Sequence, residues 1–362
     1  MVSVTASLAA RRATTGVPHA PTKRQPGSIG RPTALEELRK DIFPISSREW
    51  VEAAVPDQRG QANGKPPTII IKRSTFSVKS VVASGAFGKI FLYANGRAEV
   101  ALKIMQKGQT CPNTEDMFHR NSDIGKSFSQ YLLYQKCIRF DGFAYTTVLM
   151  EKCVGDLNYL LPLIEDPSNS AQLLKQYGLN MWCLKLDILL KTLGAVFCLH
   201  ERGYMYTDLK SANILYNVEV DKTAGNVYNI VPKLADLDGV CTSQTSTTTT
   251  FPPPEMWNGK MGTCDDPKLA WAIGVFIIEI MLNRKDSRMV TRGLWYKNVV
   301  RKGRDAVAMT DELKNSLAEL RGMVPEDLEK LKGALNPDPM GRTTMDVIVR
   351  IILKYYQQER LY

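Results

Sequence analysis

The sequence lacks any uninterrupted apolar run of about 18 residues, the length that a membrane-spanning helix needs, so no transmembrane segment is expected. It has only three histidines, far apart, and no C-x-x-C pair, which argues against a zinc site. The seven cysteines are widely spaced and odd in number. This pattern predicts reduced, structural thiols and no disulfide scaffold.

The start of the 362-residue chain has no acidic residue before Glu36, although basic residues, prolines and small polar residues are frequent there. This composition predicts a disordered basic extension over residues 1–34. Residues 35–67 are interpreted as a further N-terminal extension. A short helix is possible between Ala34 and Ala54, with Leu35, Leu38, Ile42 and Trp50 as its apolar contacts. The formal net charge of +10 points to acidic partners, whether a peptide, a nucleotide, a membrane surface or a nucleic acid.

From Thr68 the pattern becomes rich in β-branched and aromatic residues, in four short runs at residues 69–71, 76–82, 90–93 and 100–105. Such runs, with a turn signal at Asn95-Gly96, predict an antiparallel sheet. After Asp156 the apolar residues recur every three or four positions, as in helices. The sequence therefore predicts an α+β chain with a small β lobe over 68–153 and a larger, mainly helical lobe over 154–362.

The most informative segment is Tyr206–Leu215, a polar loop that follows an apolar helix ending near Gly203. Asp208 is suited to orient a substrate hydroxyl, Lys210 to neutralise a moving phosphoryl group, and Asn213 to hold a metal ion. The spacing D-x-K-x-x-N is weak evidence alone, because surface loops contain it by chance. Its value depends on the rest of a phosphotransfer site being present at the right distances.

A glycine-containing segment, residues 83–90, lies between two predicted strands. Its small residues would let main-chain amides approach phosphates, although a plain tight hairpin is an equal alternative. Fifteen residues after Gly88 comes Lys103, at the end of the strand Val100–Lys103. That interval accommodates a strand, a turn and a second strand, which would place Lys103 beneath the glycine loop; a solvent-facing strand lysine is the alternative.

A further carboxylate, Asp236, follows a predicted strand downstream of the polar loop Tyr206–Leu215, which we call the catalytic loop. Carboxylate oxygens on such a turn suit Mg²⁺, which prefers oxygen ligands. An ordinary turn aspartate is the alternative reading.

Taken together, these motifs resemble the eukaryotic protein kinase superfamily from about Phe76 onward, in the order that its members share. Further matches are Met150 to Cys153 as hinge, Pro253-Pro254-Glu255, Trp271 to Gly274, and Asp338-Pro339 with Arg342, which would pair with Glu255. The resemblance implies a bilobal protein kinase fold, ATP and Mg²⁺ as cofactors, and the serine/threonine type, because Lys210 stands two residues after Asp208. It implies Asp208 and Lys210 as catalytic residues and Asn213 and Asp236 as metal ligands. The residues that it implies for nucleotide binding are Ala83, Ser84, Gly85, Ala86, Phe87, Gly88, Ile90, Ala101, Lys103, Met150, Glu151 and Cys153.

Several positions depart from the kinase pattern. Ala83 replaces the first loop glycine, Thr207 replaces the arginine before Asp208, and Asp238 replaces the glycine after Asp236. Leu269 stands where an aspartate usually anchors the catalytic loop. The acid expected to pair with Lys103 is Asp123, with Glu115 and Asp116 as the other candidates.

Two hypotheses remain. The first is an active kinase acting on protein substrates, and the second is a pseudokinase that binds nucleotide and regulates a partner protein. The sequence disfavours a nucleic-acid partner, because the densest positive charge has no interleaved aromatic residues. The basic, proline-rich extension and the P-P-E motif also resemble apicomplexan rhoptry-type secreted kinases. Location stays open between the cytoplasm and secretion into a host cell.

Overall fold

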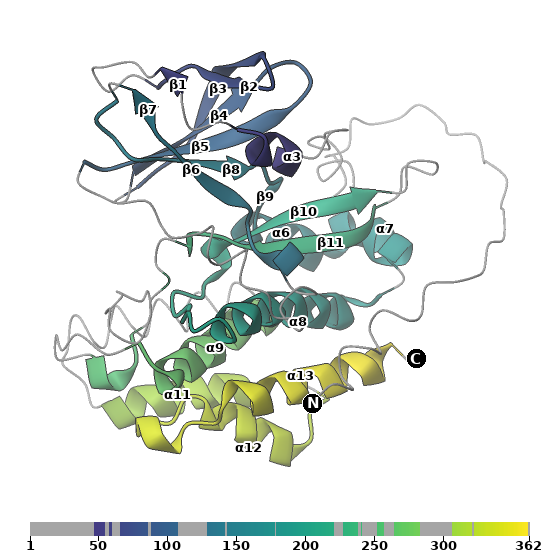
Figure 1. Cartoon of the computed structure of the whole chain (residues 1–362). Helices are drawn as coiled ribbons and strands as arrows, with labels where there is room; N and C mark the ends of the chain where they lie inside the picture. The colour runs from purple at the N-terminus through teal and green to yellow at the C-terminus, as the bar shows by residue number, and fades with distance from the viewer. Residues whose placement is uncertain are drawn as a thin grey trace, which may run out of the picture.

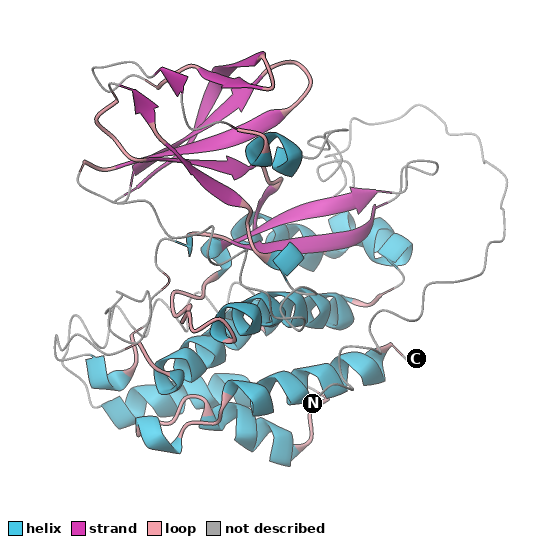
Figure 2. Ribbon diagram, in the orientation of Figure 1, coloured by secondary structure: helices cyan, strands magenta, loops and turns pink. Residues whose placement is uncertain are grey.

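The computed structural model describes residues 47–54, 58–59, 66–85, 88–107, 129–141, 143–177, 179–220, 227–237, 240, 252–256, 264–282, 306–320 and 322–360. A β-rich lobe lies at the top of Figure 1 and a larger helical lobe lies below it. Figure 2 shows the same division between strands and helices. The predicted order of a small antiparallel β lobe and a helical lobe is confirmed.

The upper lobe is built on a six-stranded sheet in the order β2-β3-β4-β5-β8-β6, in which every neighbouring pair is antiparallel. The strands are β2 Ile69–Ile71, β3 Ser74–Gly85, β4 Gly88–Ala94, β5 Glu99–Met105, β6 Gln135–Ile138 and β8 Thr147–Glu151. Two short strands, β1 Gln58–Arg59 and β7 Phe140–Asp141, pair in parallel beside it. Asn95 Oδ1 accepts hydrogen bonds from the amides of Arg97 and Ala98, which fixes the predicted turn at Asn95-Gly96.

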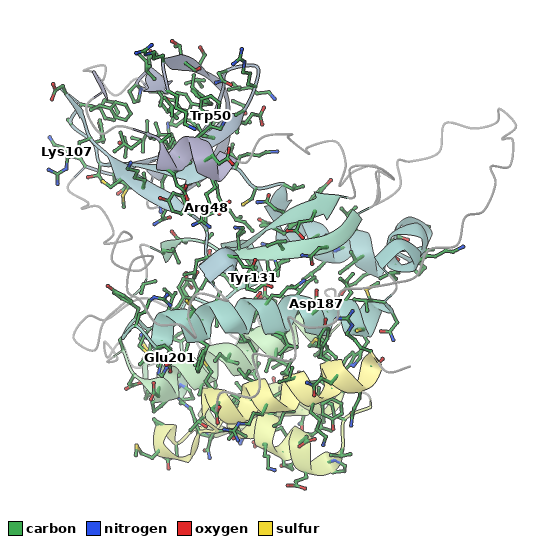
Figure 3. All side chains as sticks on the ribbon, turned by 45° about the vertical axis from the view of Figure 1, so that its right-hand side comes forward. Arg48, Trp50, Lys107, Tyr131, Asp187 and Glu201 are labelled. Atoms are coloured by element: carbon green, nitrogen blue, oxygen red, sulfur yellow. The ribbon has the colours of Figure 1, made fainter. Side chains whose placement is uncertain are left out.

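A short helix, α3 Ser47–Glu52, lies in the predicted N-terminal extension and packs on the upper lobe. Its Trp50 meets Phe76 edge to face, with ring centroids 5.3 Å apart, and Val51 is fully buried in the same core. Lys136 Nζ donates hydrogen bonds to the carbonyls of Glu52 and Ala54, which cap the end of the helix. Figure 3 labels Trp50 among the side chains of this lobe. The other predicted contacts, Leu35, Leu38 and Ile42, lie outside the described residues.

Two faces of the sheet serve different purposes because strand side chains alternate. Val100, Leu102 and Leu149 face the core that α3 covers. On the opposite face, Val148 and Met150 of β8 join Met105 in a second apolar cluster that reaches Ala235 of the lower lobe. This second face of the sheet is therefore the one that is turned toward the lower lobe.

The lower lobe is organised around two buried helices, α8 Met181–His200 and α9 Asp266–Met281. Around them lie α6 Leu157–Glu165, α7 Pro167–Tyr177, α11 Ala306–Ala318, α12 Pro325–Gly333 and α13 Met345–Glu359. Asn180 caps the start of α8, and beyond its end Gly203 takes the left-handed φ of 79° expected of a terminating glycine. Within the described residues, no helix is long and apolar enough to cross a membrane.

Between Asn213 and Asp236 lie the antiparallel strands β10 Ile214–Val220 and β11 Val227–Leu234, and β9 Gly155–Asp156 pairs with β10. Three 3-10 turns complete the framework of the site: η2 Ser211–Asn213, η4 Pro254–Met256 and η7 Pro339–Gly341.

The prediction that all cysteines are reduced is wrong for two of them. Cys137 in β6 and Cys264 before α9 each take part in a disulfide bond, whereas Cys153, Cys183 and Cys198 are free. Disulfide formation depends on which side chains meet in space. The spacing of cysteines along the sequence does not contain that information.

Candidate active site

In the loop 206–215, Asp208 contacts both Lys210 and Asn213. Lys210 Nζ lies 2.7 Å from Asp208 Oδ2. Asn213 Nδ2 donates to the main-chain carbonyl of Asp208 at 2.9 Å and to its carboxylate at 3.0 Å. The amide nitrogen of Asn213 therefore faces Asp208, and its amide oxygen is the atom suited to a metal ion.

One side-chain and one main-chain hydrogen bond join this loop to the segment that carries Asp236. The hydroxyl of Tyr206 donates to the carbonyl of Ala235 at 2.7 Å, and the amide of Ala235 donates to the carbonyl of Asn213 at 2.8 Å. Asp236 itself has a φ of 53°, in the left-handed region that few non-glycine residues adopt. Backbone strain of this kind concentrates at functional sites.

Lys103 crosses from the upper lobe to this segment. Its Nζ lies 3.0 Å from Asp236 Oδ1, and the lysine is only 8% exposed. The strand register places Lys103 opposite Ile90 on β4 and Val148 on β8. Lys103 is thus directed between the lobes and is not a solvent-facing strand lysine. The three acids considered as its partners, Asp123, Glu115 and Asp116, lie outside the described residues.

The glycine segment forms the hairpin between β3 and β4. Gly85 pairs with Gly88, Ser84 with Lys89 and Ala83 with Ile90. Gly88 has a φ of 137°, and a Cβ there would lie 2.1 Å from the carbonyl oxygen of Ile104, so only glycine fits. The tip residues Ala86 and Phe87 lie outside the described residues. The predicted hairpin is present, with Gly88 pairing with Met105 on β5, the strand of Lys103.

An apolar cluster connects the upper lobe to Ala235 of the lower lobe. Met105, Leu133, Val148, Met150 and Ala235 form it, with Ile90, Ala101, Cys153 and Leu215 packed against it. Four of the residues assigned to nucleotide binding, Ile90, Ala101, Met150 and Cys153, are therefore brought together here. Burial, and next the nearby charge of Glu151, raise the pKa of the Cys153 thiol, so it stays protonated at neutral pH.

The side chain of Glu151, another residue assigned to nucleotide binding, forms a buried ion pair within the protein. It is 5% exposed, accepts a hydrogen bond from the Tyr134 amide at 2.8 Å, and lies 3.1 Å from Lys233 Nζ. This buried pair joins β8 to β11. Any contact between Glu151 and a nucleotide would have to come from its main chain.

Glu279 was not among the sequence-predicted residues, yet it contacts the catalytic loop. It lies near the end of α9, and its carboxylate accepts from both the amide and the hydroxyl of Ser211. The available signal was a single carboxylate within the otherwise apolar stretch 269–282. Leu269, at the position of the missing aspartate, is 1% exposed in the apolar core.

The predicted pairing of Glu255 with Arg342 is confirmed. Arg342 Nη1 and Nη2 lie 2.8 and 2.6 Å from the two carboxylate oxygens of Glu255. The guanidinium also donates to the carbonyls of Pro267 and Asn336 and lies over the ring of Trp271, 5.2 Å from its centroid. These contacts fix η4 against α9 and η7.

The two lobes, the catalytic loop and the lysine between them define a protein kinase fold. Consistent with this, the chain belongs to the protein kinase domain family, which matches residues 76–352. It is 27% identical over 267 residues to the serine/threonine-protein kinase AtPK2/AtPK19 of Arabidopsis thaliana, covering 72% of this chain and 51% of that protein. It is 25% identical over 257 residues to the eye isozyme of protein kinase C of Drosophila melanogaster, covering 68% of this chain and 33% of that protein. The chain thus spans about half or less of these relatives.

Proposed function

We propose that this chain transfers the γ-phosphoryl group of ATP to serine or threonine hydroxyls of protein substrates, with Mg²⁺ as the metal. The observation that carries the proposal is the convergence of four residues on one site. Lys103 comes from β5, Asp208 and Asn213 from the catalytic loop, and Asp236 from the segment after β11, and two contacts of 3.0 Å link them in pairs. The similarity to serine/threonine-protein kinases of Arabidopsis thaliana favours the serine/threonine type.

Each residue has a role in this reaction. The Asp208 carboxylate would orient the substrate hydroxyl and accept its proton, while Lys210, 2.7 Å away, would face the charge of the moving phosphoryl group. Lys103 would bind the nucleotide phosphates. Asn213 and Asp236 offer oxygen donors of the kind that Mg²⁺ prefers, and they would hold it. Bound magnesium would neutralise phosphate charge.

A test is the transfer of radiolabelled phosphate from ATP to a generic basic protein. We expect transfer by the full chain, loss of transfer in Asp208→Asn, and retention in Asp327→Asn. Asp327 is a matched control, because it is a buried carboxylate on α12 that is bonded to Lys354 and Tyr355. Equal signals from the full chain and Asp208→Asn would refute the proposal.

The second candidate function is that of a pseudokinase that binds nucleotide and regulates a partner protein. It is favoured by Thr207 and Leu269, both buried, where the kinase pattern has charged side chains. Thermal stabilisation by ATP with Mg²⁺, lost in Lys103→Met, together with absent transfer would support it. No stabilisation at saturating ATP, with folded protein confirmed, would count against both functions. The rhoptry-type resemblance gains no support from the plant and insect relatives, and the proposal does not extend to it.

A further inference from the structure

Two cysteines of the described chain take part in disulfide bonds, one in each lobe. Cys137 lies on β6, an edge strand of the main sheet, opposite Val148 on β8. Cys264 lies directly before α9 in the lower lobe. A disulfide needs its two Cα atoms within about 7 Å of each other, and β6 and α9 are well separated in Figure 1. The two cysteines therefore belong to two different disulfides.

Burial distinguishes a structural disulfide from a regulatory one. Disulfides that are reduced and re-formed during function are exposed or strained, because a thiolate must reach one of the sulfur atoms. Cys264 is only 3% exposed, so a reductant reaches it only after local unfolding. The disulfide of Cys264 is thus of the persistent kind. Such disulfides are rare where glutathione and thioredoxin keep thiols reduced.

The cysteines outside the disulfides are shielded from oxidants. Cys183 and Cys198 on α8 are 1% and 0% exposed. Burial, and next the charge of Asp187, raise the pKa of the Cys183 thiol to about 11, and burial raises the pKa of the Cys198 thiol. Both thiols are therefore unreactive at neutral pH, since the thiolate is the form that attacks disulfides and is oxidised. In the described part of the chain, each cysteine is thus either bonded or, as at Cys153 too, held protonated.

Each disulfide fastens an element that supports the candidate site. Cys264 precedes Asp265, whose carboxylate caps the start of α9. Two residues further on, the carbonyl of Pro267 accepts a hydrogen bond from Arg342, which also binds Glu255 of η4. The other disulfide restrains β6, which is paired with β8, the strand that leads into the hinge. Loss of either bond would loosen the support of one half of the site.

We propose that phosphotransfer by this chain requires both disulfides, which confines the reaction to protein substrates of an oxidising compartment. The inference rests on the proposed function and adds the class of its substrates. Each disulfide forms when two thiols lose two electrons and two protons. Oxidised glutathione accepts them and is released as two molecules of reduced glutathione, so the oxidant is one that such compartments contain.

Refolding tests whether the disulfides form. The full chain is unfolded, reduced and refolded, either at the glutathione ratio of the secretory pathway or with excess dithiothreitol, and is then alkylated in denaturant. In the glutathione buffer, seven cysteines minus the four of two disulfides leave three thiols to alkylate. Peptide mass spectrometry should find Cys137 and Cys264 protected there and alkylated after dithiothreitol. Alkylation of both in the glutathione buffer would overturn the inference.

The same two preparations test whether the disulfides matter. The Tm of the oxidised chain should be at least about 5 °C higher than that of the reduced chain, the order expected for disulfides in a chain of this size. Transfer of phosphate to a generic basic protein should be at least about tenfold faster for the oxidised chain. The Tm supplies a readout that does not depend on activity.

Cys264→Ala and Cys183→Ala form a matched pair that needs no refolding. Both changes remove a sulfur atom from a buried site, so both leave a cavity of similar size. Without reductant, Cys264→Ala should lower the Tm by about 5 °C more than Cys183→Ala. In dithiothreitol this excess should disappear, because the disulfide is then absent from both variants.

The outcomes separate the two proposals. A chain that transfers no phosphate, yet loses Tm on reduction and in Cys264→Ala, would refute the proposed function and retain the need for an oxidising compartment. An active chain with the same Tm and rate in both preparations would overturn the inference and leave the proposed function intact. Equal effects of Cys264→Ala and Cys183→Ala without reductant would also overturn it.

Discussion

The two halves of the candidate site are positioned by different means. In the upper half, Lys103 and the glycine hairpin take their places from the register of β3, β4 and β5, a ladder of main-chain hydrogen bonds. In the lower half, individual side chains hold the catalytic loop: Tyr206 bonds Ala235, Asn213 bonds Asp208, and Glu279 bonds Ser211. Each of these three contacts involves a residue that is less than 10% exposed.

This difference has a consequence for substitution. A strand register is shared among many residues, so a change to an exposed side chain of β3, such as Val81 or Val82, leaves it intact. A loop held by single side chains depends on each of them. Chemistry should therefore be sensitive to single changes in the lower half, whereas nucleotide binding should depend mainly on Lys103 and on backbone conformation in the upper half.

The largest expected effect is that of Asp208→Asn. We expect transfer to fall about 10³-fold, the order that a positioned acid or base contributes. Stabilisation by ATP with Mg²⁺ should persist, because the upper half would still bind the nucleotide. Transfer rates and thermal shifts on the same preparation measure both. A parallel loss of binding would show that the two halves are not separable.

Arg342→Met tests the support beneath the lower half. The Arg342 side chain is 1% exposed and binds both carboxylate oxygens of Glu255, so its removal leaves an acid without its partner. We expect a loss of about 3 kcal/mol in the free energy of unfolding, measured by chemical denaturation. Arg350→Met is the control, since its pair with Asp346 is exposed; it should cost less than about 0.5 kcal/mol. Similar values for both variants would contradict a structural role for the pair of the buried Arg342 with Glu255.

Gly88→Ala tests whether the upper half depends on backbone conformation. The added Cβ would meet the Ile104 carbonyl, and the positive φ would be strained, at a cost of about 1–3 kcal/mol. Affinity for ATP should fall together with stability. Gly96→Ala is the control, because Gly96 also has a positive φ but no atom within 4 Å of the new Cβ. Equal effects of the two changes would mean that the close approach at Gly88 is unimportant.

A smaller effect is expected from pH at Asp327, away from the site. Its hydrogen bond with Lys354, and next that with Tyr355, holds the pKa of the Asp327 carboxyl below its ordinary value of 3.8. A lowered folded-state pKa adds stability above the ordinary value, and this contribution is lost as pH falls through the folded-state pKa. The difference in Tm between the unaltered chain and Asp327→Asn should therefore shrink below about pH 4. A difference that grows on acidification would contradict this.

The smallest effect is expected from the segment between Asp236 and Glu255, which corresponds in the kinase pattern to the activation segment. Thr207 replaces the arginine that would receive a phosphate there. Replacing Ser243, Thr245, Ser246 and Thr247 to Thr250 with alanine should leave kcat nearly unchanged. A tenfold loss, about 1.4 kcal/mol of barrier, would overturn this prediction.

The sequence was most predictive where local patterns decide the structure. The four β-rich runs coincide with β2 to β5 because β-branched runs between turn signals are a local property. The contact of Glu255 with Arg342 followed from a family pattern. The partners of buried charged side chains could not be predicted from the sequence. Glu151 pairs with Lys233 and Glu279 with Ser211, and both contacts depend on tertiary packing.

The packing of α3 bears on how this domain is prepared for experiments. The family match starts at Phe76, and the first strand of the main sheet starts at Ile69. A recombinant version shortened to either point would lack Trp50 and Val51 and would expose the ring of Phe76 to water. Exposed aromatic surface of this kind promotes aggregation. Expression plasmids should therefore begin upstream of Ser47, and a poor yield from a shorter version would say nothing about catalytic competence.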